Sequence, residues 1–180
     1  MKYRFIATCT AGALLCAAPA FAQSTGFSPN LYGTLGYNNF NDDGGANLSA
    51  ITGRLGMRPS PFFGAEGEVS VGVGQDRTNF ANGAQGVHLN DQYAGYAVGY
   101  LPLKPNIDLF ARAGFGHSDF HVSNQGFGSD IGADSWNFGA GGQYFFDHHN
   151  GVRAEYTRED YMCSGCTGSD VWSVAYVRKF

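Results

Sequence analysis

Hydrophobic and polar residues alternate with a period of two along most of the chain after residue 23. In one such segment Val69 and Val71 share one parity, while Glu66 and Glu68 share the other. Because successive side chains of a strand point to opposite faces, this period predicts β-strands with one apolar and one polar face. Eight such segments lie between turn residues, at about 30–40, 47–58, 63–75, 91–101, 107–120, 135–146, 151–161 and 170–180. Each is close to the ~9–11 residues with which a tilted strand crosses a bilayer.

The connections between these segments are alternately short and long. The short ones are 59–62, 102–106 and 147–150, the long polar ones are 76–90, 121–134 and 162–169, and only 41–46 is short where a long loop is expected. Pro59, Pro61 and Pro105 lie in short connections, where a proline does not interrupt a strand ladder. Short turns at one end and long loops at the other are typical of a β-barrel in the bacterial outer membrane.

The first residues of the chain have the composition of an export signal. Lys2 and Arg4 precede an apolar run over 5–18, and Ala20-Phe21-Ala22 has the small-residue pattern of a cleavage site. The alternative is a buried N-terminal helix, and the run is too short for a transmembrane helix, which needs ~20 apolar residues. We therefore expect residues 1–22 to be a cleaved signal peptide and residues 23–180 to form the barrel domain.

Composition and charge exclude one class of partner for the mature chain. After residue 22 it has nine Lys and Arg against fifteen Asp and Glu, a formal net charge of −6. An acidic chain lacks the basic surface that binds phosphate backbones, so we expect no nucleic-acid partner. The 27 glycines and the 15% aromatic residues suit tight turns, a narrow barrel interior and aromatic girdles at a membrane surface.

Two kinds of barrel are compatible with alternation, and they differ in which face lies inside. A soluble barrel that holds a ligand has its apolar face inside, whereas a membrane barrel turns that face to lipid. The polar face carries seven charged residues, Arg54, Arg58, Glu66, Glu68, Arg112, Arg153 and Glu155. Aromatic residues gather near the segment ends, namely Tyr32, Phe40, Phe62, Phe63, Tyr93, Tyr100, Trp136, Phe146, Tyr161 and Trp172. Aromatic residues at those positions match the two headgroup levels of a bilayer, so we expect the seven charges to lie inside a membrane barrel.

The last segment adds a signal for assembly into the outer membrane. Trp172, Val174, Tyr176 and Phe180 share one parity, and Phe180 is the last residue printed. This resembles the C-terminal signal read by the barrel-assembly machinery, from which Arg178 departs; at the rim its long side chain reaches headgroups.

The whole mature chain resembles the small outer-membrane β-barrel family that includes OmpA-like, OmpX-like and opacity-type porin-family surface proteins. Residues 151–156, Gly-Val-Arg-Ala-Glu-Tyr, resemble the penultimate strand of the opacity-like members. The resemblance implies an all-β, eight-stranded antiparallel up-and-down transmembrane barrel in the outer membrane of a Gram-negative bacterium. It also implies outer-membrane lipids, lipopolysaccharide and the barrel-assembly machinery as partners.

Some barrels of this size modify lipid A, and one motif here is similar to theirs. His121-Val122-Ser123-Asn124 resembles the His-x-Ser-Asn of PagL-type lipid A deacylases, in which His and Ser cooperate in acyl transfer. That family carries the motif on its penultimate strand, and here residues 151–159 contain neither His nor Ser. We therefore expect no catalysis, with a deacylase-like enzyme as a further alternative.

Two other small motifs suit structural roles. Cys163 and Cys166 stand in Cys-Ser-Gly-Cys, for which an exported protein favours a local disulfide over a redox centre or a metal site. His148-His149 has no further ligands nearby in the sequence, so these are expected to be solvated turn residues. We expect no metal site and no cofactor.

The interior charges also bear on transport. Eight strands leave an interior just wide enough for side chains, and buried charges need partners. We therefore expect paired charges that fill the interior and no wide pore, with a narrow gated channel as the alternative. The leading hypothesis is a surface protein with a structural role or with an extracellular ligand bound by its loops. Arg158, with outward parity near the outer rim, has two readings that stay open, a contact with lipopolysaccharide phosphates or a solvated charge.

Overall fold

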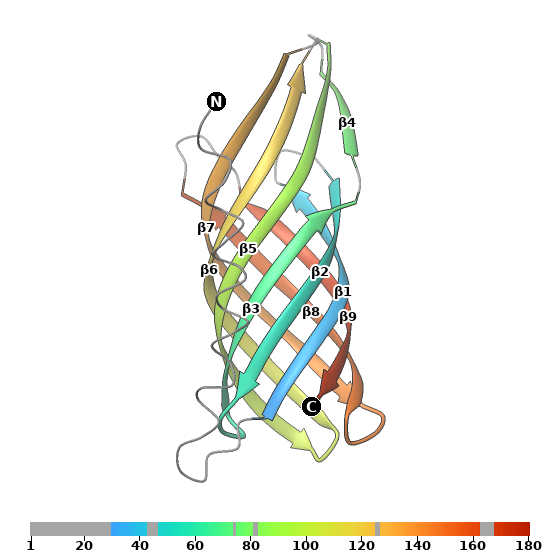
Figure 1. The fold of residues 1–180 in the computed structure, drawn as a ribbon, viewed down its shortest axis with the longest axis vertical. Coiled ribbons are helices and arrows are strands. Elements are labelled where there is room, and N and C mark those ends of the chain that lie inside the picture. Colours follow the sequence, from blue (N-terminus) through green and yellow to red (C-terminus); the bar gives the residue numbers. More distant parts are fainter. Residues whose placement is uncertain (1–29, 43–46, 74, 81–82, 125–126, 163–167) are drawn as a thin grey trace.

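The computed structural model describes residues 30–42, 47–73, 75–80, 83–124, 127–162 and 168–180 (Figure 1). The expected signal peptide and its cleavage site lie outside these residues, as do Cys163 and Cys166. Every regular element in the described part is a β-strand. No helix among the described residues is long and apolar enough to cross a membrane.

Nine strands follow one another along the chain. They are β1 (Asn30–Asp42), β2 (Asn47–Arg58), β3 (Phe63–Gly72), β4 (Gln75–Phe80), β5 (Gly83–Lys104), β6 (Ile107–Asn124), β7 (Phe127–Phe145), β8 (Asn150–Tyr161) and β9 (Ser169–Lys179). Neighbouring strands are antiparallel, β1 pairs with β9, and β3 pairs with β5. Eight strands, all but β4, thus close into a tilted barrel, which confirms the predicted fold class (Figure 1).

Two segments predicted to be loops are largely strand. In the first, 76–90, β4 forms a hairpin with residues 83–88 of β5, and in the second, 121–134, β6 and β7 pair as far as Asn124↔Phe127. The loop prediction was wrong because strands were predicted only where residues of one parity are apolar, whereas residues of both parities are largely polar in these two segments. A hairpin ladder satisfies its backbone without such a face.

Alternation divides the strands into an inner and an outer face as the sequence predicts. In β3, Glu66, Glu68 and Ser70 are buried, while Val69 and Val71 are about half exposed. The same parity holds in β6, β7 and β8. In the first and fourth segments alternation is less regular, and eight buried residues turn inward: Tyr32, Thr34, Asn38, Phe40, Gln92, Tyr96, Val98 and Tyr100.

The predicted aromatic girdle is partly wrong. Tyr32, Phe40 and Tyr100 are each only 5% exposed and lie inside the barrel near its ends. Tyr161 is half-buried with inward parity. The other six aromatic residues named above are exposed on the outside. Tyrosine tolerates the interior because its hydroxyl finds a partner there; that of Tyr32 donates to Glu66 Oε1 at 2.6 Å.

Apolar side chains also occupy the interior, in three separate clusters. Phe40, Leu48, Ala50, Leu89 and Val171 form the upper cluster, at the end of the barrel where β9 begins. Tyr32, Phe145 and Val177 form the lower cluster, at the end with the short turns and the C-terminus (Figure 1). Tyr96, Val98, Tyr100 and Phe110 form the third. Polar and charged residues fill the remaining interior, which is where the candidate site lies.

Two glycines test this division into faces. A Cβ on Gly141, inside the barrel, would press on the Ala154 carbonyl oxygen and lie 2.7 Å from both Glu155 Cβ and the Phe110 ring, whereas a Cβ on Gly67 would meet nothing within 4 Å. We expect Gly141→Ala to lower the free energy of unfolding by about 1–3 kcal/mol, a usual cost of overpacking. Gly67→Ala is the matched control and should change it little. Urea unfolding of the protein refolded in lipid vesicles measures both, and equal losses would contradict the assigned faces.

Candidate functional site

Six charged residues meet in the middle of the barrel interior and form what we name the ion-pair cluster. They are Arg54 on β2, Glu66 and Glu68 on β3, Arg112 on β6, and Arg153 and Glu155 on β8. Each is at most 4% exposed. Three guanidinium and three carboxylate groups make the cluster formally neutral. Its members come from strands far apart in the sequence, so the cluster exists only in the closed barrel.

Arg153 joins the two carboxylates nearest to it. Its Nη1 lies 2.5 Å from Glu66 Oε1 and its Nη2 donates to Glu66 Oε2 at 3.1 Å, so the pair is bidentate. Its Nε lies 2.8 Å from Glu155 Oε2. Charge-assisted, bidentate bonds of this kind are the strongest that side chains form, and they fix the position of both partners.

Arg54 and Arg112 complete the cluster by sharing the same two carboxylates. Arg54 contacts Glu68 Oε2 at 2.5 Å and Glu155 Oε1 at 2.6 Å. Arg112 contacts Glu68 Oε2 and Glu155 Oε1, both at 2.8 Å, and its Nη2 donates to Thr157 Oγ1 at 2.9 Å. Every carboxylate therefore lies between at least two guanidinium groups, which is the arrangement that offsets the cost of burying charge.

Aromatic rings cover two of these guanidinium groups. Arg112 Cζ lies 4.0 Å from the centre of the Tyr96 ring, and Arg153 Cζ lies 3.9 Å from that of Phe110. Both rings belong to the third apolar cluster. Cation–π contacts of this kind are favourable where water is excluded.

Arg58, the seventh predicted interior charge, stands apart from the cluster. It pairs with Asp108 at 2.8 Å near the lower end, and Gln143 Nε2 donates to the same carboxylate oxygen at 2.8 Å. Both residues line a cavity of about 500 Å³ at that mouth, which Lys104, Lys179 and Tyr100 also line. The cavity is a vestibule at the lower end, and this pair forms part of its lining.

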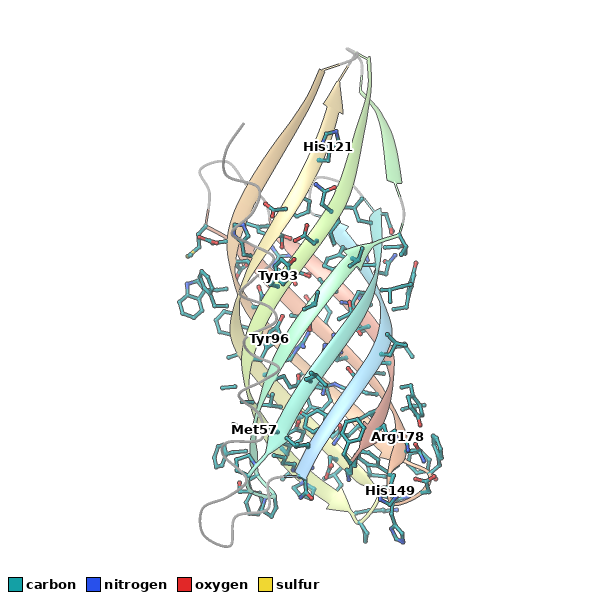
Figure 2. All side chains as sticks on the ribbon, in the orientation of Figure 1. Met57, Tyr93, Tyr96, His121, His149 and Arg178 are labelled. Carbon is teal, nitrogen blue, oxygen red and sulfur yellow. The ribbon has the colours of Figure 1, made fainter. Side chains whose placement is uncertain are left out.

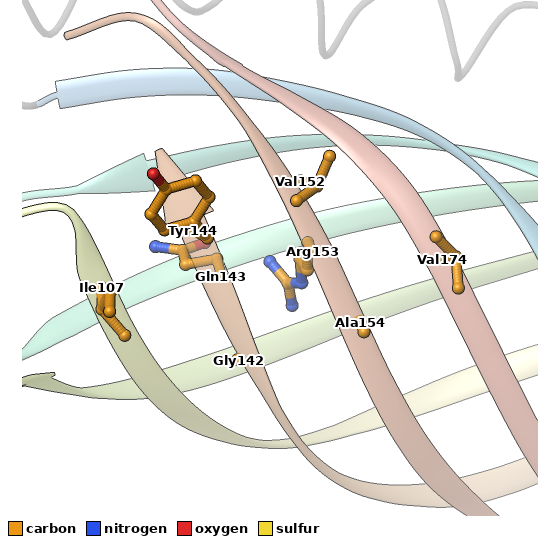
Figure 3. A pocket seen from close by; sticks show the side chains of 8 residues that line it. All are labelled: Ile107, Gly142, Gln143, Tyr144, Val152, Arg153, Ala154 and Val174. Atoms are coloured by element: carbon orange, nitrogen blue, oxygen red, sulfur yellow. The ribbon is translucent and has the colours of Figure 1, made fainter. Parts of the chain in front are cut away.

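A second hollow lies on the outer surface of the barrel and is apolar. Its volume is about 320 Å³, and Ile107, Gly142, Tyr144, Val152, Ala154 and Val174 contribute outward side chains or backbone to it. Figure 3 shows Val152 and Arg153 leaving β8 in different directions, in agreement with their exposures of 48% and 1%. The hollow faces outward and offers acyl chains an apolar surface.

Two interior carboxylates are missing from the interior charges predicted above. Asp108 and Glu159 both have the inward parity of their strands, so the pattern contained the signal for each. Glu159 is 1% exposed; Gln92 Nε2 donates to its two oxygens at 2.9 and 3.0 Å, and the Tyr161 hydroxyl donates at 3.1 Å. Asn137 and Tyr96 form a further buried pair, with Asn137 Nδ2 donating to the Tyr96 hydroxyl at 3.0 Å.

The remaining predicted residues lie away from the interior cluster. His121 lies high on β6 (Figure 2), and the side chain of Ser123 lies outside the described residues. His148 and His149 are exposed in the turn after β7. Among the described residues no three His, Cys, Asp or Glu side chains gather as a metal site requires.

The residues of the expected assembly signal all face outward on β9 or just after it. Trp172, Val174, Tyr176 and Phe180 are between 44% and 71% exposed. Arg178 has the same parity and lies near the lower end, among the rim residues (Figure 2).

Arg158 and His117 lie near the upper rim, and both have acidic partners. Arg158 contacts Asp170 at 3.0 Å and Asp160 at 3.2 Å. His117 Nδ1 lies 2.6 Å from Asp134 Oδ1, just beyond the point where β7 stops pairing with β8, and this hydrogen bond raises the pKa of His117. The structure thus gives Arg158 intramolecular carboxylate partners, in addition to the two readings left open by its sequence position.

Comparison with known proteins places this architecture in a family. The family model described as "outer membrane protein beta-barrel domain" matches residues 8–180. No curated protein matches the chain significantly in sequence.

Solved outer-membrane barrels have a similar fold. The attachment invasion locus protein Ail of Yersinia pestis, solved with a heparin analogue, is 15% identical, with a TM-score of 0.61 over 85% of this chain and 99% of Ail. The N-terminal barrel domain of Pseudomonas aeruginosa OprF is 15% identical, with a TM-score of 0.63 over 85% of this chain and all of that domain. Neisserial surface protein A is 12% identical, with a TM-score of 0.64 over 87% of this chain and all of its own. At these identities the likeness concerns the fold alone.

The ion-pair cluster predicts a large effect of a small change. Glu68→Gln keeps the shape of the side chain but leaves Arg54 and Arg112 without one of their carboxylates, so we expect a loss of about 3–5 kcal/mol in the free energy of unfolding. Asp160→Asn removes an exposed carboxylate and should cost at most about 1 kcal/mol. Urea unfolding in lipid vesicles compares the two variants. A Glu68→Gln protein as stable as wild type would show that the cluster is not needed for stability.

Proposed function

The chain belongs to the outer membrane protein β-barrel family, and from this premise we propose that it is a non-enzymatic surface protein that presents a sheet to extracellular partners. It lies in the outer membrane of a Gram-negative bacterium, as members of this family do. The proposal includes export by residues 1–22 as a cleaved signal peptide, and assembly through the outward residues of β9 by the barrel-assembly machinery. Outer-membrane lipids and lipopolysaccharide surround the apolar outer face.

The observation that carries this proposal is the unequal length of the strands. Pairing between β3 and β5 ends at Val71↔Asp91, and pairing between β7 and β8 ends at Ser135↔Tyr161. Pairing of β5 with β6 continues to Gln85↔Asn124. β4 and the extended parts of β5, β6 and β7 form a sheet that protrudes at the upper end of Figure 1. We name it the protruding sheet; it consists of the described residues within 75–91 and 117–134.

The protruding sheet has two open edges. In the described part of the chain, β4 pairs only with β5, and residues 127–133 of β7 pair only with β6. An open edge offers unpaired backbone donors and acceptors, to which an extended segment of another protein adds as a further strand. We infer that the partner binds at such an edge.

The acidic sequence of the protruding sheet indicates the charge that its partner carries. It carries five aspartates, Asp76, Asp91, Asp119, Asp130 and Asp134, against one arginine, Arg77. Ail has been solved with a heparin analogue, which is a polyanion. An acidic sheet repels polyanions, so the partner proposed here is a basic or neutral protein segment.

Removal of the protruding sheet tests the proposal. Replacing 76–88 and 121–132 with short turns should leave the barrel folded but abolish retention of displaying bacteria on cultured epithelial cells and on extracellular-matrix protein. Replacement of His148-His149 by Asn-Gly, in a turn at the opposite end, is the control and should leave retention unchanged. Heat-modifiable gel migration checks folding of both variants. Retention that survives loss of the sheet would refute the proposed role.

A further prediction concerns ion transport and distinguishes the proposed surface protein from a narrow channel. The ion-pair cluster fills the middle of the interior, and apolar clusters lie on either side of it. We therefore expect planar bilayers that contain the purified protein to show very small conductance or none. Steady channels of nanosiemens size would contradict a filled interior, and release of acyl chains from purified lipopolysaccharide would instead support the deacylase alternative.

A further inference from the structure

One interior carboxylate has no cation of the protein beside it. Glu159 on β8 is 1% exposed, and within the described residues no Lys, Arg or His nitrogen lies within ion-pair distance of it. The cluster charges that act on it from further away, Glu68 and Arg112, have opposite signs and belong to a neutral group. A buried carboxylate without a compensating charge is costly, so Glu159 requires either a proton or a bound cation.

Four buried oxygen atoms on neighbouring strands have no hydrogen-bond partner among the described residues. They are Gln92 Oε1, Asn137 Oδ1, Ser118 Oγ and Ser135 Oγ, and each of these residues is 0% exposed. We name this group, with Glu159, the Glu159 chamber. Two amide oxygens among them accept and cannot donate, so only a donor or a cation satisfies them.

Strand register brings these residues together. Asn137 on β7 is the direct partner of Glu159 on β8, and Gln92 on β5 is that of Ser118 on β6. Gln92 Nε2, which is bonded to both oxygens of Glu159, brings the two strand pairs into contact across the interior. A Cβ built on Gly116 would lie 2.8 Å from Asn137 Nδ2 and 3.3 Å from Ser135 Oγ, so those two groups lie close together beside this glycine.

The Glu159 chamber lies between less polar neighbours at the upper end and the ion-pair cluster. Tyr161, whose hydroxyl bonds Glu159, packs edge-on against Phe120, and Phe120 packs against the upper apolar cluster. On the other side, Thr157, two residues before Glu159, accepts a bond from Arg112 of the ion-pair cluster. A cation held here is shielded from bulk water on both sides.

We propose that the Glu159 chamber binds one monovalent alkali-metal cation, such as Na⁺, through the Glu159 carboxylate and the neutral oxygens of Gln92, Asn137, Ser118 and Ser135. One unit of positive charge matches the single carboxylate, and neutral oxygens replace the hydration shell of such ions in other proteins. Calcium sites recruit several carboxylates, and this chamber has one. A proton on Glu159 would donate to one oxygen only and would leave the others unsatisfied.

This site differs from the expectation that the chain has no metal site. The sequence analysis considered only His148-His149 and the cysteine pair, which are ligands for transition metals. An alkali-metal site requires no His or Cys and is not apparent from sequence motifs. It is also independent of the proposed surface role, because it concerns the interior of the barrel.

Thermal unfolding in two salts tests the proposal. The protein is refolded in detergent micelles, and its unfolding midpoint is compared in sodium chloride and in N-methylglucamine chloride at the same ionic strength and pH. A cation that binds only the folded state stabilises it, so we expect the wild-type midpoint to be higher in sodium by on the order of 5 °C. Glu159→Gln should lose this difference, and in N-methylglucamine it should unfold no earlier than wild type. Asp160→Asn, which removes the neighbouring but exposed carboxylate, should keep the difference.

Anomalous diffraction gives a second readout that does not depend on the variant folding. Wild-type crystals soaked in rubidium chloride should show an anomalous peak within coordination distance of the Glu159 carboxylate. Equal wild-type midpoints in the two salts, together with no peak in the Glu159 chamber, would overturn the proposal. A sodium effect that survives in Glu159→Gln would also overturn it, because the cation would then bind elsewhere.

Discussion

Mutual compensation of buried charges is the interaction on which the rest of this structure depends. Arg54, Arg112 and Arg153 carry their charge inside the barrel because each lies against at least one carboxylate of Glu66, Glu68 or Glu155. With the ionic side chains satisfied inside, the outer face is free to be apolar, which a bilayer requires. Closure of β1 on β9 then satisfies the backbone of every barrel strand without water. The filled interior in turn leaves recognition to the part of the chain that extends beyond the membrane.

The faces of the barrel were predictable where the contrast between parities is strong. In β3 valines alternate with glutamates, and the structure has the predicted faces. In β1 and β5 the contrast is weak because Tyr32, Tyr96 and Tyr100 put aromatic rings on the polar face, where their hydroxyls are bonded. A rule that places aromatic residues outside fails there, since tyrosine meets the demands of both environments.

The sequence alone could not predict which interior residues pair with one another. Arg153 and Glu66 are 87 residues apart, and their contact depends on the tilt and register of eight strands, which period-two alternation does not define. Glu159 was within reach, because it has the inward parity of β8, but its lack of a cation becomes visible only in three dimensions. The protruding sheet was missed for a different reason: its strands are held by backbone ladders with little apolar contrast to mark them.

Orientation of the apolar face toward lipid is the central claim, and tryptophan fluorescence tests it most directly. The sequence has two tryptophans, Trp136 and Trp172, and they are 51% and 60% exposed on the outer face. In vesicles of lipids brominated on their acyl chains, the account predicts strong quenching of this fluorescence and little quenching by aqueous iodide. Emission that is insensitive to brominated lipid and quenched by iodide would place these residues in water and contradict the account.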